Sequence, residues 1–158
     1  MPRADLRRAD RDRPPPSTRA LIGDRAGIIS KIEKGGRASV AGHDPRASSR
    51  EFRKAIGVVP DNLALLPELT IEEHLAACGP IYGLSRDTTR KRASELLSFF
   101  ELDEARGTYA RHGSHGMRKK TAIALALLHD PAVLMLDEPF EGLDPSAADA
   151  LAALLASL

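Results

Sequence analysis

The sequence predicts an α/β fold with a mostly parallel sheet, and two apolar runs separated by helical segments indicate it. Residues 132–136 (AVLML) are continuously apolar, as is typical of a strand that is covered on both faces. Residues 55–60 (AIGVVP) form a second run of strand-forming residues, which ends at a proline. We therefore expect helices to connect strands of one buried sheet.

Length and composition exclude several classes of protein. The chain has 158 residues, the size of one domain, and its 42% hydrophobic and 28% charged residues argue against a disordered chain or a coiled coil. The net charge is +1, whereas a protein that binds nucleic acid usually has an excess of basic residues. We therefore expect no nucleic acid as a partner. A single cysteine, Cys78, can form neither an internal disulfide nor a zinc cluster, which is typical of a reducing cytosolic compartment.

The N-terminal segment is expected to be a tail. Residues 1–19 alternate arginine with aspartate and end in a run of three prolines, a composition that buries too little apolar surface to become ordered. No apolar segment follows the arginines, so a signal peptide is not predicted. No stretch reaches the roughly 18–20 apolar residues that a membrane span needs. We expect one domain over residues 20–158.

Short strands and turns are predicted first along this domain. Residues 19–23 (RALIG) suit a strand that leads into a turn at Gly23, and residues 37–42 (RASVAG) suit another. After the strand at 55–60, a turn should begin at Asp61. Thr70 and Glu73 form a capping-box pattern, which predicts a helix from Ile71 to about Cys78, where a Gly-Pro pair ends it.

Three more helices follow in the sequence. Asp87 can cap the first of them, which should end near residue 102. Its apolar residues recur at helical spacing and should share one face: Ala93, Leu96, Leu97 and Phe100. Residues 118–128 (RKKTAIALALL) form a strong helix after a glycine-containing loop, and residues 146–158 form an Ala/Leu helix.

Two carboxylates lie immediately beyond the strand at 132–136. Ligand sites of open α/β sheets lie at this end of the strands, and adjacent acidic residues there are costly unless a cation or a proton transfer uses them. Asp137 would hold Mg²⁺, and Glu138 would orient the water that attacks a γ-phosphate. By themselves, the two residues would equally suit a loop cap.

A second candidate site is the loop that opens onto the helix at 118–128. Free N–H groups and the positive end of the helix dipole suit a phosphate there. Ser114 would add a hydroxyl donor, and Gly116 would let the backbone come close. The alternative is an ordinary helix cap. Further on, Asp144 and Pro145 also suit a turn and a helix start.

The order of these motifs resembles that of the ATP-binding subunit of ABC transporters, and is closest to bacterial ABC-2-like exporters. Residues 113–117 are similar to the signature loop LSGGQ, residues 134–139 (LMLDEP) to the Walker B motif, and residues 142–145 to the D-loop. Asp61 stands where the Q-loop has a glutamine. The resemblance covers about residues 20–158.

The resemblance implies a P-loop NTPase-like fold, incomplete at both ends, with a helical subdomain over residues 69–106. It implies ATP and Mg²⁺ as cofactors, and membrane permease subunits and a second ATPase subunit as partners, at the cytoplasmic face of the membrane. Two subunits would enclose two ATP molecules, with Ser114 and Gly116 of one contacting the nucleotide of the other. Asp137 and Glu138 would act on metal and water, and Asp144 would join the cofactor-binding residues.

The sequence departs from the family pattern at the Walker A motif, GxxxxGK[ST]. Gly23 and Gly27 resemble the remains of this phosphate loop and are its candidate residues, but Ile28 stands where lysine is required. Ser30 and Lys31 follow in reversed order. The chain also stops before the segment that carries the family's switch histidine. Three interpretations stay open: an ATPase subunit with altered ends, a degenerate half-site that pairs with an active subunit without hydrolysing ATP, and a stand-alone interaction domain.

Overall fold

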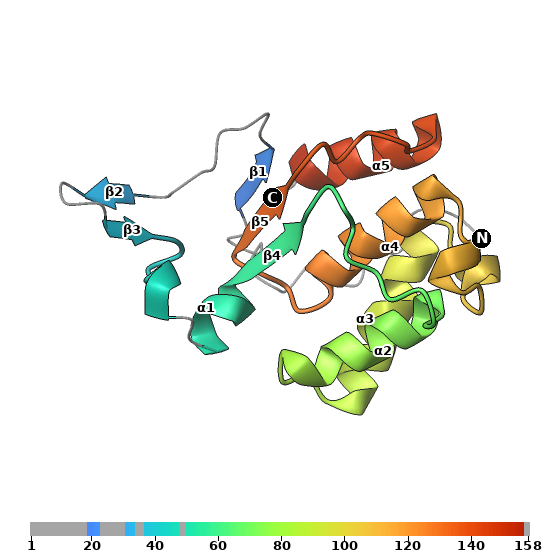
Figure 1. Ribbon diagram of the computed structural model, residues 1–158, viewed down its shortest axis with the longest axis horizontal. Coiled ribbons are helices and arrows are strands. Elements are labelled where there is room, and N and C mark those ends of the chain that lie inside the picture. Colours follow the sequence, from blue (N-terminus) through green and yellow to red (C-terminus); the bar gives the residue numbers. More distant parts are fainter. Residues whose placement is uncertain (1–18, 23–30, 34–36, 48–49, 157–158) are drawn as a thin grey trace.

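A parallel sheet forms the centre of the described structure, with the strand Val133–Leu136 (β5) between Arg19–Ile22 (β1) and Ile56–Val59 (β4) (Figure 1). In the computed structural model, which describes residues 19–22, 31–33, 37–47 and 50–156, this sheet has three strands. Leu134 pairs with one residue of each neighbouring strand. The predicted strands and their parallel arrangement are confirmed.

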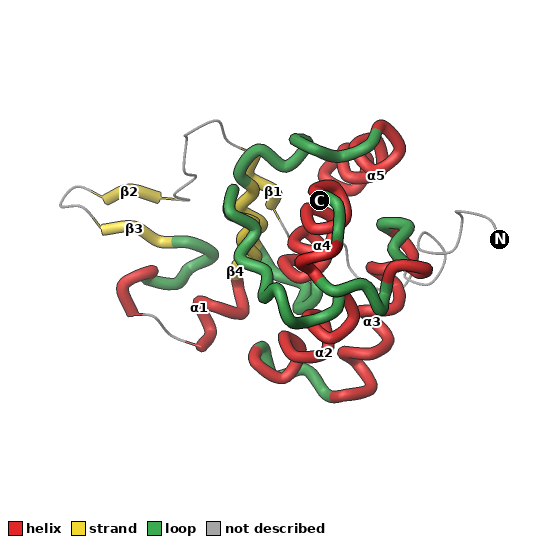
Figure 2. Tube along the Cα trace, turned by 45° about the vertical axis from the view of Figure 1, so that its right-hand side comes forward, coloured by secondary structure: helices red, strands yellow, loops and turns green. Residues whose placement is uncertain are grey.

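A separate antiparallel pair lies between β1 and β4 in the chain. Lys31–Glu33 (β2) pairs with Arg37–Ser39 (β3), which confirms the strand expected at residues 37–42, and the pair projects away from the parallel sheet in both views (Figures 1 and 2). A short helix, Arg50–Ala55 (α1), leads directly into β4. No helix was predicted there, because six residues are too few to show a helical period.

Burial alternates along β4, although its apolar sequence predicts burial on both faces. Val59 is only 1% exposed, whereas Val58 is 49% exposed. Gly57 faces the helix His115–Leu127 (α4), and a Cβ there would overlap the main-chain oxygen of Ala126. The glycine therefore lets α4 pack directly against one face of the sheet.

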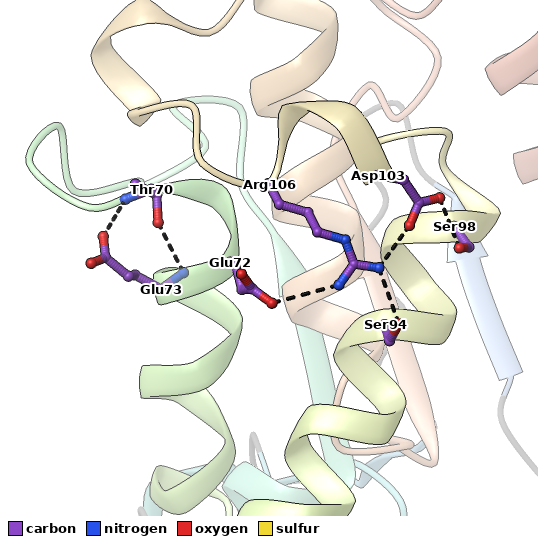
Figure 3. A network of polar contacts seen from close by, with 7 residues as sticks. All are labelled: Thr70, Glu72, Glu73, Ser94, Ser98, Asp103 and Arg106. Carbon is purple, nitrogen blue, oxygen red and sulfur yellow. Dashed lines mark hydrogen bonds and ion pairs between the residues drawn. The ribbon is translucent and has the colours of Figure 1, made fainter.

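The capping box forms as predicted and starts the helix Ile71–Ile81 (α2) (Figure 3). The Thr70 hydroxyl accepts from the Glu73 N–H at 3.2 Å, and the Glu73 carboxylate accepts from the Thr70 N–H at 2.8 Å. Hydrogen bonding of the exposed Glu73 carboxyl, first to the main chain of Thr70 and then to its side chain, lowers the pKa of that carboxyl. The predicted end of the helix is wrong, because α2 continues through the Gly-Pro pair for another turn.

Gly79 explains why α2 continues. A Cβ at this position would overlap the side chain of Thr89 in the helix Arg86–Phe99 (α3), so glycine allows the close approach of the two helices. Glycine also removes the Cβ that clashes with a following proline ring. Pro80 lies in the last turn, where the single hydrogen bond that it removes matters least.

Helix α3 buries the predicted apolar face. Ala93, Leu97 and Phe100 are buried, and Leu96 packs against the core. Its cap is Ser85, whose hydroxyl accepts from the Thr88 N–H at 3.1 Å, and not Asp87. The helix ends before residue 102, because the chain turns at Glu101, which has a positive φ of 56°.

Arg106 joins α2 and α3 at this turn (Figure 3). Its guanidinium lies 3.5 Å from the Glu72 carboxylate, and it donates to the Ser94 hydroxyl at 3.0 Å and to Asp103 at 2.6 Å. Ser98 donates to the other oxygen of Asp103. The hydrogen bonds from Arg106 and Ser98 lower the pKa of the Asp103 carboxyl. The Arg106 side chain thus links α2, α3 and the turn that follows α3, in the helical segment between β4 and α4.

The core lies where α4 meets β4, α2 and α3, and the helix Pro145–Ala156 (α5) adds Leu151 to it. Ile123 of α4, Leu75 of α2 and Leu134 of β5 are fully buried. Among the residues that the structure describes, no helix has both the length and the apolarity to cross a membrane.

Several predictions from the sequence lie outside the described residues or are not tested by the fold. Gly23 and Gly27 are outside them, as are residues 1–18 of the expected tail. The boundaries of the domain at 20–158 and of the helical subdomain at 69–106 stay predictions.

Replacement of Gly79 with alanine should lower the free energy of unfolding by about 1–3 kcal/mol, because the new methyl group strikes Thr89. This steric cost should outweigh the gain of up to about 1 kcal/mol that alanine brings to a helix. Gly107→Ala is the matched control, since a Cβ there meets nothing within 4 Å. Urea unfolding measures both variants, and a Gly79→Ala variant more stable than wild type would contradict the packing described above.

Candidate functional site

Asp137 and Glu138 follow the central strand directly, and both are exposed. The Asp137 N–H donates to the Val59 carbonyl at 3.0 Å, which extends the pairing of β5 with β4 by one residue. Its carbonyl accepts from Lys119 Nζ of α4 at 3.2 Å. The sheet and α4 therefore fix the position from which the two carboxylates project.

Glu138 lies in a cluster of exposed acids that sequence reasoning missed. Carboxylate oxygens of Asp61, Glu138 and Glu141 all lie within 4.8 Å of one another. Asp61 follows β4 and Glu138 follows β5, so the parallel strands bring both to the same edge of the sheet. The two strands and the acids after them were a sufficient signal for this pair, whereas nothing in the sequence pointed to Glu141.

The cluster raises the pKa of the Glu138 carboxyl above its ordinary value. The first cause is a hydrogen bond with Glu141, followed by the negative charges of Glu141, Asp137 and Asp61. Neighbouring carboxylates repel one another, and a proton or a cation relieves the repulsion. Carboxylate oxygens are also the ligands that Mg²⁺ prefers, so these residues fit a magnesium ion.

Ser114 caps α4, which therefore begins three residues before the predicted start at residue 118. Its hydroxyl oxygen accepts from the Met117 N–H at 3.1 Å, and the hydroxyl can still donate a proton to another group. The first N–H groups of a helix suit an anion such as phosphate. The geometry is thus that of an ordinary helix cap and is also compatible with a phosphate contact.

The loop at the start of α4 packs tightly against the segment 138–144. A Cβ on Gly116 would lie 2.9 Å from the main-chain oxygen of Gly142, and a Cβ on Gly142 would overlap the His115 ring. Gly142 also has a φ of 73°, which favours glycine. The predicted signature loop at 113–117 and the predicted D-loop at 142–145 are therefore in direct contact within one chain.

Asp144 uses both of its carboxylate oxygens within the chain. One accepts from Lys120 Nζ at 2.7 Å, and the other accepts from the Ala147 N–H at 2.9 Å and caps α5. The hydrogen bond from Lys120 is the main cause that lowers the pKa of the Asp144 carboxyl. The predicted helix start is confirmed, and a nucleotide role for Asp144 stays a prediction.

A shallow hollow of about 350 Å³ lies between the segment after β4 and the start of α4. Asp61 and Asn62 line it on one side, and His115 and Arg118 on the other. Arg118 is held by a hydrogen bond to the Gly113 carbonyl at 2.9 Å. The hollow connects the acidic cluster with the loop at 113–117.

These features place an acidic pair at the end of a central parallel strand, next to a capped helix start, and define an open α/β protein with a candidate ligand site at the ends of its strands. A family model, that of the ABC transporter, matches residues 26–141, and the chain belongs to this family. The resemblance that the motif order suggested is confirmed.

Two bacterial ATP-binding proteins are among the curated relatives. The linearmycin resistance ATP-binding protein LnrL of Bacillus subtilis is 36% identical over 112 residues, which are 71% of this chain and 36% of that protein. The doxorubicin resistance ATP-binding protein DrrA of Mycobacterium tuberculosis is 40% identical over 136 residues, which are 82% of this chain and 40% of that protein. The chain thus spans 36–40% of the length of these relatives.

Solved structures agree with the fold. An ATP-binding subunit of an ABC transporter superposes with a TM-score of 0.72 at 30% identity, over 89% of this chain and 62% of that one. The ATP-binding cassette MJ0796, a dimer bound to ADP and Pi, superposes with a TM-score of 0.67 at 25% identity, over 80% of this chain and 59% of that one. The predicted P-loop NTPase-like fold is confirmed.

Asp144→Asn should lower the free energy of unfolding at neutral pH by about 1 kcal/mol, because the ion pair with Lys120 is lost while an amide oxygen can still cap α5. The folded-state pKa of Asp144 lies below its unfolded value of ~3.9, so the ion pair stabilises the fold above that pH and is lost as the pH falls.

The difference between the wild type and Asp144→Asn should therefore shrink in urea unfolding below about pH 4. Asp149→Asn, at an exposed position later in α5, is the control. A difference that stays constant down to about pH 3 would show that the charge of Asp144 does not stabilise the fold.

Proposed function

We propose that the chain is the ATP-binding subunit of an ABC transporter, which couples ATP binding and hydrolysis to the transport of a substrate across a membrane. The observation that carries the proposal is the position of Asp137 and Glu138. They project from the end of the central strand of the sheet, in a chain of this family, beside a helix start suited to phosphate.

The residues at the carboxyl ends of the strands have different roles in the proposed reaction. Asp137 would hold a magnesium ion beside the acidic cluster of Asp61, Glu138 and Glu141, and the ion would supply charge neutralisation for the phosphates when bound. Glu138 orients the attacking water and accepts its proton, a role that a raised pKa favours. Ser114 and Gly116 contact the nucleotide held by a second subunit, with Asp144 nearby.

The proposed partners are a second ATPase subunit and membrane permease subunits. The dimeric MJ0796 cassette and the ATP-binding resistance proteins among the relatives support this assignment. The chain would lie in the cytoplasm at the inner face of the membrane, held there by the permease, with no nucleic acid involved. The segment after Asp61, where Leu66 is 58% exposed, would contact the membrane subunit.

The alternative function is a degenerate half-site, and the sequence of the phosphate loop favours it. Ile28 follows Gly27 where the family has the lysine that binds the β- and γ-phosphates. Such a chain would still donate Ser114 to ATP held by an active partner. It would pair with that partner and would not hydrolyse ATP itself.

A Mg-ATP titration of the purified chain tests binding in cis. We expect binding in the millimolar range or tighter, and Asp137→Asn should weaken it by about tenfold or more, because the carboxylate is a metal ligand. The main-chain bonds of Asp137 hold it in place, so asparagine should leave the fold intact. Asp87→Asn, an exposed site on α3, is the control. A folded chain that binds no Mg-ATP would refute the site in cis.

Mixing the chain with a complete homologous subunit tests the half-site. If this chain completes the partner's ATP site, mixing should increase hydrolysis, and Ser114→Gly should abolish the increase because it removes the hydroxyl. Glycine is chosen because it costs a helix cap only a few tenths of a kcal/mol. Stimulation that survives Ser114→Gly would rule out a role for this hydroxyl in trans.

A further inference from the structure

Lys119 is a buried charge that, within the described part of the chain, hydrogen-bonds a main-chain carbonyl and pairs with no carboxylate. The residue is 1% exposed, although lysine is almost never fully buried unless it is paired. Its Nζ donates to the main-chain oxygen of Asp137 at 3.2 Å. A carbonyl carries no formal charge and offsets the cost of burying an ammonium only in part. The burial of Lys119 is therefore explained by the group that its ammonium binds.

That group is the peptide between Asp137 and Glu138. The carbonyl that Lys119 binds belongs to the same planar unit as the Glu138 N–H, so fixing its oxygen fixes the orientation of the whole unit. On the other side of Asp137, the N–H is held by the Val59 carbonyl. Lys119 thus acts at the first peptide beyond the last hydrogen bond between β5 and β4.

Glu138 begins with a strained backbone conformation directly after this peptide. Its φ is 43°, in the left-handed region that residues other than glycine seldom adopt. Such a conformation persists only where the surroundings hold it. A rotation of the peptide changes ψ of Asp137 and φ of Glu138 together, so the hydrogen bond from Lys119 opposes its relaxation.

The far end of the segment is held by the same helix. Lys120, the next residue of α4, binds the Asp144 carboxylate, and Gly116 lies against Gly142. The segment between β5 and α5 is therefore attached to α4 near both of its ends. The direction in which Glu138 projects from the sheet depends on the contact at the start of this segment, which is the hydrogen bond from Lys119 to the Asp137 carbonyl.

We propose that Lys119 is a positioning residue for Glu138, which it holds in the left-handed conformation through the carbonyl of Asp137. The consequence for hydrolysis rests on the proposed function, whereas the effect on the backbone needs no nucleotide. Lys119 touches neither nucleotide nor water in this role. It determines where the Glu138 carboxylate points.

Nuclear magnetic resonance of the full chain without nucleotide tests the backbone effect. The three-bond coupling between the Glu138 amide and α protons, with the Cα and Cβ shifts, reports its φ. Lys119→Met keeps the length of the side chain and removes the donor, so Glu138 should leave the left-handed region. Lys119→Arg should retain it, and Lys91→Met, at an exposed position in α3, is the control.

A folded Lys119→Met variant in which Glu138 keeps its left-handed φ would overturn the proposal. Lys119→Leu is interpreted in the same way if the methionine variant does not fold. The proposal is supported if Glu138 loses its left-handed φ in Lys119→Met and keeps it in Lys119→Arg. If Lys119 acted only by filling space, the methionine and arginine variants would not differ in this way.

ATP turnover gives the second measurement. In Lys119→Met, kcat should fall by at least about tenfold, because the water-orienting carboxylate is displaced, while KM changes by less than about twofold. Lys119→Arg should restore most of kcat. An unchanged kcat in folded Lys119→Met would overturn the catalytic part. If the wild type turns over no ATP, the proposed hydrolysis fails, and the Glu138 backbone measurement still decides this inference.

Discussion

The pairing of β5 on both sides is the constraint on which the described structure depends. Because β5 hydrogen-bonds to β1 and β4 in parallel, all three strands end at the same edge, and the residues that follow them meet there. Asp61 and Glu138 come together for this reason. The extra bond from Asp137 to Val59 carries the regular pairing up to the first carboxylate. An acidic edge is thus a consequence of strand direction.

Helix α4 connects this edge with the rest of the molecule. One side of the helix packs on the sheet at Gly57, where the lack of a side chain permits contact with its backbone. Other positions contact α2 and α3 in the common core. Lys119 and Lys120 reach the ends of the segment 137–144. A displacement of α4 would therefore move the sheet edge, the helical segment and the loop at 113–117 together.

The sequence predicted what local patterns encode. The strand at 132–136, the capping box at Thr70 and the apolar face around Leu97 follow from hydrophobic period and short-range hydrogen bonding, and the structure has all three. Helix ends were predicted less well. The helix through Gly79 continues because a neighbouring helix fits against the glycine. Helix α4 starts at His115 because the Ser114 hydroxyl accepts a hydrogen bond from the Met117 N–H. The sequence alone does not contain these contacts.

Part of the candidate site was likewise predicted from the sequence, and part of it was found only in the tertiary structure. The order of motifs along the chain was enough to identify the family. It also nominated the candidate site residues Asp137, Glu138, Ser114, Gly116 and Asp144, because each lies at a fixed distance from a recognisable strand or helix. Only the tertiary structure brought Glu141 to Glu138 and buried Lys119 and Lys120 against the loop. The physical reason is that periodicity assigns a residue to a face, whereas the approach of two elements decides which charged groups on those faces meet.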